Sequence, residues 1–423
     1  MNKTNELFDF IKSSPSAYHT VGAVAQRLRD AGYTEISERD SEAFCDGGRH
    51  FVIRNGSSVI AFSGRAESSF MITASHGDFP AFKVKDACDG TYARLSTEKY
   101  GGMIYYSWLD RPLSLAGRVV VKDADGMAVR LVNVDKDLLT IPSVAIHQNR
   151  GVNEGYAFNP AVDMLPLYSV AGARIDPCDL LARELEVARE DIISHDIFLY
   201  NREEPRLLEG GLILSPRLDD LACVSACLEA FVSAEPAAGS VNVLAVFDNE
   251  EVGSSTKQGA NSTFLDMTLR RIAGDDKRYC AMLADSYMVS ADNAQAKHPN
   301  HPELSDGQLA PLLGGGVAVK YNANQSYATD AVSDAVFRMA ADRVGAPVQR
   351  YASRADKPSG STLGSIADTK VSVSTVDIGL PQLAMHSASE SAAESDYLGL
   401  VGILTELYSS RVSRENGKIL LKK

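Results

Sequence analysis

The sequence predicts an α/β fold that is interrupted by an inserted β-rich domain. Apolar strand-like runs and helical stripes alternate at both ends of the chain, as in a sheet with helices on its faces. Between them, residues 87–205 are rich in aromatic and β-branched residues and contain turn signals such as the DADG at 123–126. The 423 residues exceed what one core usually holds. The simplest architecture is therefore one domain, 1–86 plus 206–423, around an insert of 87–205.

Roughly the first 35 residues predict two helices, and three short strands follow. In the second helix Val21, Val24 and Leu28 recur at helical spacing, and Gly32 provides a stop. One short helix is expected inside the insert, over 178–188. Apolar and β-branched runs predict the three strands at 51–55, 57–64 and 68–75.

From residue 207 onward the pattern alternates between strand and helix. Leu221, Val224, Leu228 and Phe231 form an apolar stripe at helical spacing, which predicts a helix over 217–234. Apolar runs predict further strands at 211–215, 240–247, 279–286 and 370–379. Helices are expected between these strands, on the faces of the sheet.

The composition argues against several classes of partner and location. The net charge is −13, with 55 acidic against 42 basic residues, whereas nucleic acids and anionic membranes bind a basic face. No apolar run reaches the roughly 18 residues that a membrane span needs, and the N-terminus predicts a helix rather than a signal peptide. The six cysteines include no CxxC pair, and Cys223 and Cys227 are expected to be buried thiols. A cytoplasmic location is favoured.

Acidic and imidazole side chains stand just after several predicted strands, where open α/β sheets bind their ligands. Each alone has an ordinary explanation: Asp219 suits a helix cap, and Ser387 with Glu390 fits a capping box that opens the last helix. Those explanations would have to hold five times at corresponding places, so one shared crevice is favoured. Spacing does not choose between Asp285 and Asp292. The candidates are His76, Asp78, Asp219, Asp220, Glu250, Glu251, Asp285, Asp292, His298, His301 and His386.

Metal binding accounts for these residue types. Imidazoles and carboxylates suit zinc, manganese or cobalt, without the thiolates of a structural zinc site. An aspartate shared by two ions about 3.5–4 Å apart is the usual centre of a two-metal hydrolase. Asp78, two residues after His76, is placed to orient that imidazole. Glu250 and Glu251 would point opposite ways in an extended chain, so that one binds metal and the other takes a proton from the activated water.

Five segments resemble, in order, the metal-site segments of the aspartyl aminopeptidases, which are dinuclear zinc exopeptidases. They are SHGDFPAFKVK, SPRLDDL, FDNEEVGS, SADNAQAKHPN and VDIGLPQLAMHS. The segments YGGMIYYSWLDRPLSLAGRV, AIHQNRGVNEG and GSTLG extend the likeness over nearly the whole chain. The resemblance implies a zinc-exopeptidase-like α/β/α catalytic domain interrupted by a β-rich dimerisation domain.

The resemblance also implies how two divalent ions, zinc in the family, would be held. One ion would take His76, Asp219 and Asp292, and the other would take Asp219, Glu251 and His386. Asp219 would then bridge the two ions. The family's SAD…HPN string selects Asp292 as the ligand of the fourth segment.

Further roles follow from the same resemblance. Glu250 would be the general base and later the proton donor to the leaving amine. His147 matches a histidine that a neighbouring subunit contributes to steady the tetrahedral intermediate, in a dimer-based homo-oligomer of twelve subunits arranged as a tetrahedral shell. Lys320 and Tyr327 match positions that hold an acidic side chain of the substrate, and a lysine pairs well with a carboxylate. The expected function is removal of one residue from peptides with a free, preferably acidic, N-terminus.

The chain departs from the family pattern near these residues, although every implied ligand is present. Gln295 stands where the family usually has histidine, and Asp220 replaces the usual asparagine. Gly77 replaces a threonine, and residues 354–364 differ just before their glycines. These departures leave the choice among Asp, Glu and neutral N-terminal residues open.

Two other functions are compatible with the sequence. One is a dinuclear deacylase of related fold that acts on N-acyl amino acids, which Lys320 and Tyr327 disfavour. The other is a catalytically silent shell that keeps the family fold. The presence of Glu250 disfavours it, because a silent relative has no need of a general base.

Overall fold

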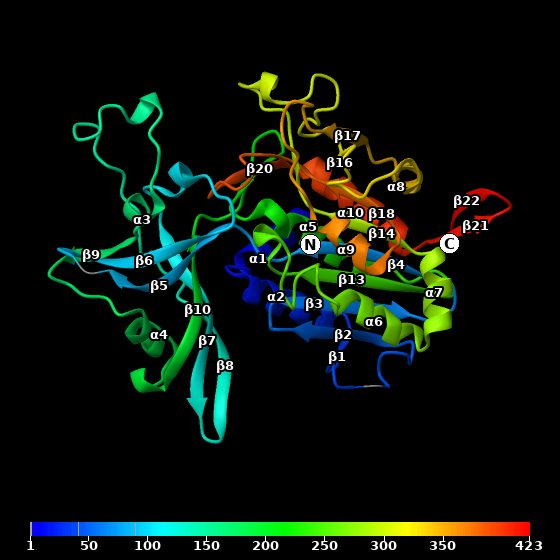
Figure 1. Cartoon of the computed structure of the whole chain (residues 1–423), viewed down its shortest axis with the longest axis horizontal. Helices are drawn as coiled ribbons and strands as arrows, with labels where there is room; N and C mark the ends of the chain where they lie inside the picture. The colour runs from blue at the N-terminus through cyan, green and yellow to red at the C-terminus, as the bar shows by residue number, and fades with distance from the viewer. Residues whose placement is uncertain (1, 41, 89) are drawn as a thin grey trace.

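The computed structural model describes residues 2–40, 42–88 and 90–423. Figure 1 shows a central sheet wrapped by helices and, beside it, a second sheet that carries long loops. Within the described residues the central sheet has nine strands in the order β1-β2-β3-β13-β4-β14-β18-β16-β17. They are β1 (Thr34–Glu35), β2 (Arg49–Arg54), β3 (Ser58–Gly64), β4 (Ser69–His76), β13 (Ser240–Phe247), β14 (Tyr287–Ala291), β16 (Val317–Tyr321), β17 (Val348–Ala352) and β18 (Ser374–Gly379).

The middle of the central sheet is parallel, and its carboxyl ends meet at one edge. β13 pairs with β4, β4 with β14, and β14 with β18, all in parallel. In the β13–β4 register Phe247 lies opposite His76, so both strands end at the same level. Every residue of β4 and of β13 is buried, as expected for strands covered on both faces.

Helices cover both faces of this sheet and form two apolar cores. On one face Leu244 and Val246 of β13 pack in the first core, and on the other Val243 and Ala245 pack in the second, which is the two-residue alternation of a strand. The helices of the first core are α1 (Lys3–Lys12), α2 (Ala17–Asp30), α5 (Leu218–Ser233), α8 (Ala331–Val344) and α10 (Glu394–Tyr408). Those of the second are α6 (Phe264–Ala273), α7 (Asp276–Ala284) and α9 (Leu363–Val371).

The second sheet is antiparallel and has its own core. In the described part of the chain its six strands run in the order β8-β7-β10-β5-β6-β9. Trp108 and the helix α4 (Pro177–Leu185) contribute to the core, and α3 (Pro160–Asp163) follows a long loop. The strands are β5 (Ala81–Cys88), β6 (Tyr92–Tyr100), β7 (Leu113–Asp123), β8 (Gly126–Asn133), β9 (Leu167–Ala171) and β10 (Ile192–Asn201). The β-rich character predicted for 87–205 is confirmed, and the sheet already begins at Ala81.

A third, smaller sheet brings together the segments that leave the central strands. Its described strands run in the order β11-β12-β20-β19-β15. The start of α5 follows β12, and residue 386 lies between β19 and β20. The strands are β11 (Arg206–Leu208), β12 (Leu212–Ser215), β15 (Ala294–Gln295), β19 (Pro381–Leu383) and β20 (Glu390–Ala393). The C-terminal residues form a hairpin of β21 (Arg411–Glu415) and β22 (Lys418–Lys422).

Most of the predicted elements are confirmed, but the strand expected at 279–286 is wrong. Residues 276–284 form the helix α7, and the strand β14 begins only at Tyr287. Asp275 accepts a hydrogen bond from the Arg278 amide at the start of this helix, and Tyr279 and Met282 bury one face at helical spacing. A short apolar run is compatible with both structures, so the capping residue decides. No described helix of this fold combines the length and the apolar character that crossing a membrane requires.

Candidate metal centre

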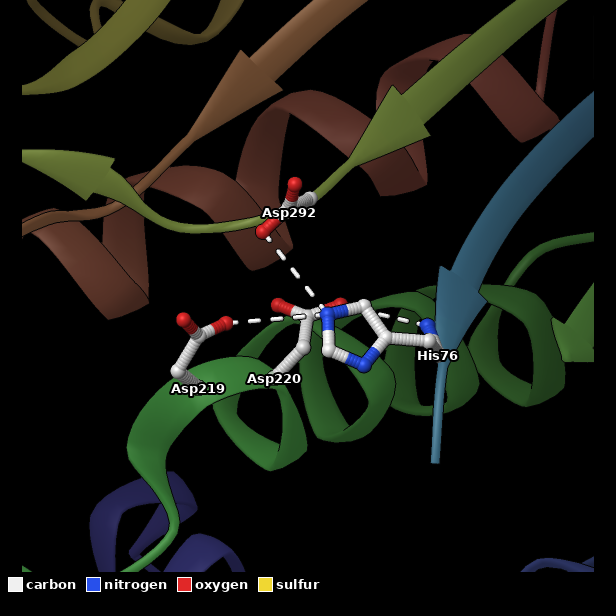
Figure 2. A group of neighbouring side chains, drawn as sticks. All are labelled: His76, Asp219, Asp220 and Asp292. Atoms are coloured by element: carbon white, nitrogen blue, oxygen red, sulfur yellow. Dashed lines mark hydrogen bonds and ion pairs between the residues drawn. The ribbon is translucent and has the colours of Figure 1, made fainter. Parts of the chain in front are cut away.

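The five predicted segments converge at the carboxyl edge of the central sheet. His76 ends β4, Asp219 opens α5, Glu251 follows β13, and Asp292 follows β14. His386 lies between β19 and β20. The described residues contain three overlapping groups whose ligating atoms lie within 4.8 Å of one another: His76, Asp219, Asp220 and Asp292; His76, Glu250 and Glu251; Asp219, Glu251 and His386. Figure 2 shows the first group, with the imidazole of His76 facing both Asp219 and Asp292.

A turn after β13 places both glutamates. Residues Glu250–Val252 form a single turn of 3-10 helix, flanked by Asn249 at φ 63° and Gly253 at φ 94°. The chain is therefore not extended there, contrary to the expectation that the two side chains point opposite ways. The Asp78 carboxylate anchors the turn, because it accepts hydrogen bonds from the Glu250 amide at 3.1 Å and the Glu251 amide at 3.2 Å.

Backbone carbonyls fix both imidazoles. His76 Nδ1 lies 3.1 Å from the Asp78 carbonyl oxygen, and His386 Nδ1 lies 2.6 Å from the Gly102 carbonyl oxygen. A carbonyl only accepts, so each Nδ1 carries a proton, and Nε2 is the nitrogen that remains to bind a metal ion or a second proton. The contact that orients His76 is thus made by the main chain of Asp78, with its carboxylate Oδ1 3.5 Å away.

Both Nε2 atoms face carboxylate oxygens at distances that suit ions held between them. His76 Nε2 lies 3.6 Å from Asp219 Oδ1 and 3.8 Å from Asp292 Oδ1. His386 Nε2 lies 3.3 Å from Asp219 Oδ2 and 3.4 Å from Glu251 Oε1. Two ligands of one tetrahedral zinc ion, each about 2.0–2.2 Å from the metal, lie about 3.4 Å apart. The two oxygens of Asp219 face different histidines, as expected for a carboxylate that bridges two ions.

Unpartnered atoms at the same place also fit metal ions. Asp219 Oδ1 and Glu251 Oε1 are buried and have no hydrogen-bond partner among the described residues. Leaving a buried carboxylate oxygen unpaired is costly, because it loses water without gaining a donor. A cation between each oxygen and the facing Nε2 removes this cost, so the donor set fits two divalent ions.

The electrostatics of these side chains also favour metal binding. Burial opposes the charging of His386, but Asp219 and Glu251 outweigh it and raise its pKa to about 10. Burial raises the pKa of Glu251 well above its usual value, and nearby Asp219 adds to the effect. Burial and the neighbouring carboxylates of Asp292 and Asp78 raise the pKa of Glu250 to about 8. So many buried acids need protons or cations nearby, and metal ions would displace those protons.

Lys320 and Tyr327 lie next to the ligand cluster. The buried Lys320 Nζ is 3.3 Å from Asp292 Oδ2 and 5.5 Å from the ring centroid of Tyr327. Burial opposes the charge, yet Asp292 and the other anions nearby raise the pKa of Lys320 above its usual value. The site therefore contains a fixed ammonium beside one candidate ligand.

Several predicted candidates lie outside the ligand cluster. His147 is exposed on the long loop between β8 and α3. Asp285 follows α7 at the opposite end of β14, where it pairs with Arg414 at 3.6 Å. The rings of His298 and His301 are tilted against each other with centroids 5.3 Å apart, and neither histidine belongs to a ligand group. Of the two aspartates that spacing left open, only Asp292 joins the cluster.

Two other acidic residues, of which Asp220 belongs to the first ligand group, also accept hydrogen bonds from the protein. Asp220 Oδ2 accepts a hydrogen bond from the backbone amide of His76 at 3.3 Å. Asp248 accepts from the Gln258 side chain at 3.3 Å, and burial raises the pKa of Asp248 to about 6, with Asp78 as the second cause.

Glu390 is a residue that the sequence interpretation missed. The last helix begins at Glu394, so Ser387 and Glu390 do not form its capping box. Instead, the buried carboxylate of Glu390 accepts hydrogen bonds from the Asp219 amide at 3.0 Å and from the His386 amide at 2.7 Å. One side chain thus fixes the backbones of two candidate ligands. Its position four residues after His386 is the only signal of this role in the sequence.

An α/β sheet with imidazoles and carboxylates gathered at its carboxyl edge defines the class of zinc-exopeptidase-like hydrolases. Residues 10–408 match the family model described as aminopeptidase I zinc metalloprotease (M18). The chain belongs to this M18 family of zinc aminopeptidases, enzymes that hydrolyse peptides at the N-terminus. The resemblance to the aspartyl aminopeptidases, which are of the M18 type, is confirmed at this level.

Similar proteins cover nearly the whole chain. A probable M18 family aminopeptidase 2 of Clostridium novyi is 38% identical over 425 residues, which cover 96% of this chain and 98% of that protein. The structure of the Ape4 and Nbr1 complex contains a chain with a TM-score of 0.92 and 31% identity, covering 96% of this chain and 85% of that one. The S. cerevisiae mApe1 dodecamer has a TM-score of 0.84 and 25% identity, with 96% of both chains covered.

Proposed function

We propose that this protein is a two-metal aminopeptidase that prefers acidic N-terminal residues. The observation that carries the proposal is the geometry around Asp219, whose two oxygens face the Nε2 atoms of two different histidines at 3.6 Å and 3.3 Å. Both histidines are already fixed through Nδ1. This arrangement supports two ion positions that share one carboxylate.

The ligands divide into two sets around that shared carboxylate. His76, Asp219 and Asp292 would hold one ion, and Asp219, Glu251 and His386 would hold the other. Bound zinc, or manganese or cobalt in its place, supplies Lewis acidity toward a water and toward the scissile carbonyl.

Glu250 is the proposed general base. It can approach His76 within the cluster, and Asp78 anchors both the Glu250 amide and the amide of Glu251. A carboxylate held in this way beside an activated water is suited to proton transfer. In this role Glu250 takes a proton from the attacking water. It later gives that proton to the departing amine nitrogen, so that the carboxylate is restored after each turnover.

Lys320 supports the acidic preference. Its buried ammonium lies beside Asp292, at the edge of the ligand cluster, with the Tyr327 ring close by. A substrate carboxylate that approached the same ammonium would gain a charge-assisted hydrogen bond. A neutral side chain would gain no such bond there.

We further propose that the antiparallel sheet belongs to a dimerisation domain of about residues 87–205 and that the protein is a homo-oligomer. Met127, Val129 and Leu131 on the edge strand β8 are exposed apolar side chains, as are Val144 and Ile146 beside His147. Exposed apolar surface of this kind is typical of subunit interfaces. The mApe1 relative is a dodecamer, which supports a dimer-based shell of twelve in which His147 reaches the site of a neighbouring subunit.

A substrate profile tests this function. Asp-, Glu-, Leu- and Ala-amides and the matching N-acetyl amino acids would be assayed with zinc, manganese or cobalt added. We expect kcat/KM to be highest for the acidic amides. Activity on the acylated set alone would indicate a deacylase, equal rates on all amides would indicate a neutral preference, and no hydrolysis of either set would indicate a silent shell.

Lys320→Met sharpens the test of the preference. We expect kcat/KM for acidic amides to fall by about tenfold to a hundredfold relative to neutral ones, the range of a lost hydrogen bond to a charged group. Lys370→Met, at an exposed position on α9, is the control. The bound metal is measured in each variant because Lys320 also contacts Asp292. A parallel fall on every amide would remove Lys320 from its proposed role in substrate choice.

A further inference from the structure

Tyr100 reaches the metal centre from the antiparallel sheet. It is the last residue of β6, and its ring packs edge-on against Phe198 of β10. Its hydroxyl donates a hydrogen bond to Asp78 Oδ2 at 2.6 Å and accepts one from the Asn249 side chain at 2.9 Å. Burial raises the pKa of Tyr100, so this hydroxyl keeps its proton and acts as a donor. Asp78 and Asn249 both belong to the central sheet's edge, on the other side of the boundary between the sheets.

Asp78 connects Tyr100 to the proposed catalytic groups by hydrogen bonds. Its two carboxylate oxygens accept from the amides of Glu250 and Glu251, and its carbonyl accepts from His76 Nδ1. A carboxylate rotates easily about its last bond unless further donors fix it. The Tyr100 hydroxyl is the donor that fixes Oδ2 from a separate part of the fold.

The next residues contact the second histidine. The Gly102 carbonyl accepts from His386 Nδ1 at 2.6 Å, and the Ile104 amide donates to the His386 carbonyl at 3.0 Å. Gly101 has φ 79°, and a Cβ there would lie 3.2 Å from Glu251 Cβ. Residues 100–104 therefore contact His386 and Glu251 directly. They reach His76 only through Asp78.

We infer that Tyr100 is a positioning residue for the metal centre: through Asp78 it fixes His76 and the glutamate turn, while the adjoining backbone fixes His386. The antiparallel sheet thus holds the site in shape in addition to any role in assembly. This inference rests on the proposed two-ion site. Partners that orient metal ligands in this way usually change metal affinity by about 10-fold to 100-fold when they are lost.

The test is Tyr100→Phe in the full chain, which keeps the ring and removes only the hydroxyl. Zinc affinity is measured by competition with a chromophoric chelator, and the cobalt form is compared by its visible absorption. We expect zinc to dissociate from at least one position about tenfold more readily, with an altered cobalt spectrum. Tyr200→Phe is the matched control, because it removes a buried hydroxyl that bonds Asn133 within the same sheet and lies away from Asp78.

A double-mutant comparison locates the effect. In an Asp78→Ala background, Tyr100→Phe should cause no further loss of zinc affinity, because the partner through which it acts is gone. Additive losses would overturn the inference, and so would a Tyr100→Phe protein that matches Tyr200→Phe in zinc affinity and cobalt spectrum. The single-variant comparison stands alone if Asp78→Ala does not fold. If the wild-type protein holds two ions and hydrolyses amides but Tyr100→Phe behaves like wild type, only this inference is overturned. If the wild-type protein holds fewer than two ions, the proposed function is overturned as well.

Discussion

At the scale of single residues, the two glutamates after β13 have different surroundings although they are adjacent. Glu251 Oε1 is buried and faces His386 Nε2 at 3.4 Å, whereas Glu250 is anchored through its amide and lies within reach of His76. Glu251 therefore suits a metal ion and Glu250 suits proton transfer. Asp248, which directly follows β13, instead accepts a hydrogen bond from the Gln258 side chain.

We expect Glu250→Gln to keep both ions and the assembly but to lower kcat by at least about a hundredfold. The amide has nearly the same shape but cannot take a proton, and general-base catalysis contributes about 10² to 10⁴ in rate. Amide hydrolysis and bound zinc per subunit are measured on the same sample. Glu406→Gln, at a salt bridge on α10, is the control and should keep the wild-type rate. A Glu250→Gln enzyme with an undiminished rate would take Glu250 out of the mechanism.

The candidate ligands could be predicted from the sequence because each follows a recognisable strand or opens a helix. The contacts that orient them could not. Glu390 and Tyr100 lie in short loops or strand ends whose partners are distant in the chain, at Asp219 and Asp78. Only the folded arrangement reveals which acidic or hydroxyl group meets which backbone amide, so such residues carry no periodic or compositional signal.

At the scale of elements, the close approach of β18 to the end of β14 sets the position of Asp292. Gly379 ends β18, and a Cβ added there would lie 2.1 Å from the Asp292 carbonyl oxygen. The backbone of Asp292 also donates to the Ile378 carbonyl at 3.0 Å. A glycine at this position lets the two strands come together so that Asp292 reaches His76.

We expect Gly379→Ala to weaken zinc binding and to lower the free energy of unfolding by about 1–3 kcal/mol, because the new methyl group must push backbone aside. Denaturant unfolding and chelator competition measure the two effects. Gly399→Ala on α10 is the matched control, since its Cβ would meet only Ala346 at an ordinary 3.8 Å. Equal stability of the two variants would show that the β18–β14 approach does not constrain Asp292.

Elements were predicted well where periodicity was long and poorly where runs were short. The parallel core of β4, β13 and β18 was apparent from continuous apolar runs. The run at 279–286 predicts a strand but lies in a helix, because four or five apolar residues suit a helix face as well as a strand and Asp275 caps the helix. The short β16 and β17 gave too little pattern to predict at all.

At the scale of the whole molecule, the loop that carries His147 contacts little of its own chain. His147 and most of its neighbours from 142 to 148 are exposed, including the apolar Val144 and Ile146. A loop of this composition is suited to a surface provided by another subunit. The proposed shared site gives this exposure a function.

We expect subunits with His147→Ala and subunits with Glu250→Gln to restore activity when they are mixed into one assembly. Each variant alone has only defective sites, whereas a mixed pair contains some sites with an intact Glu250 and an intact His147 from the neighbour. The rate of amide hydrolysis after dissociation and reassembly measures this. Mixing either variant with itself is the control, and a confirmed mixed assembly with no recovery would contradict the shared site.

The order of strands in the central sheet has a consequence for how the enzyme comes into being. β4 lies between β13 and β14, and the proposed ligands run from His76 to His386 in a chain of 423 residues. A nascent chain therefore has no complete ion-binding set until nearly all of it has been synthesised. Prematurely terminated chains that lack His386 should be inactive. Incomplete products would then not hydrolyse the N-termini of newly synthesised proteins.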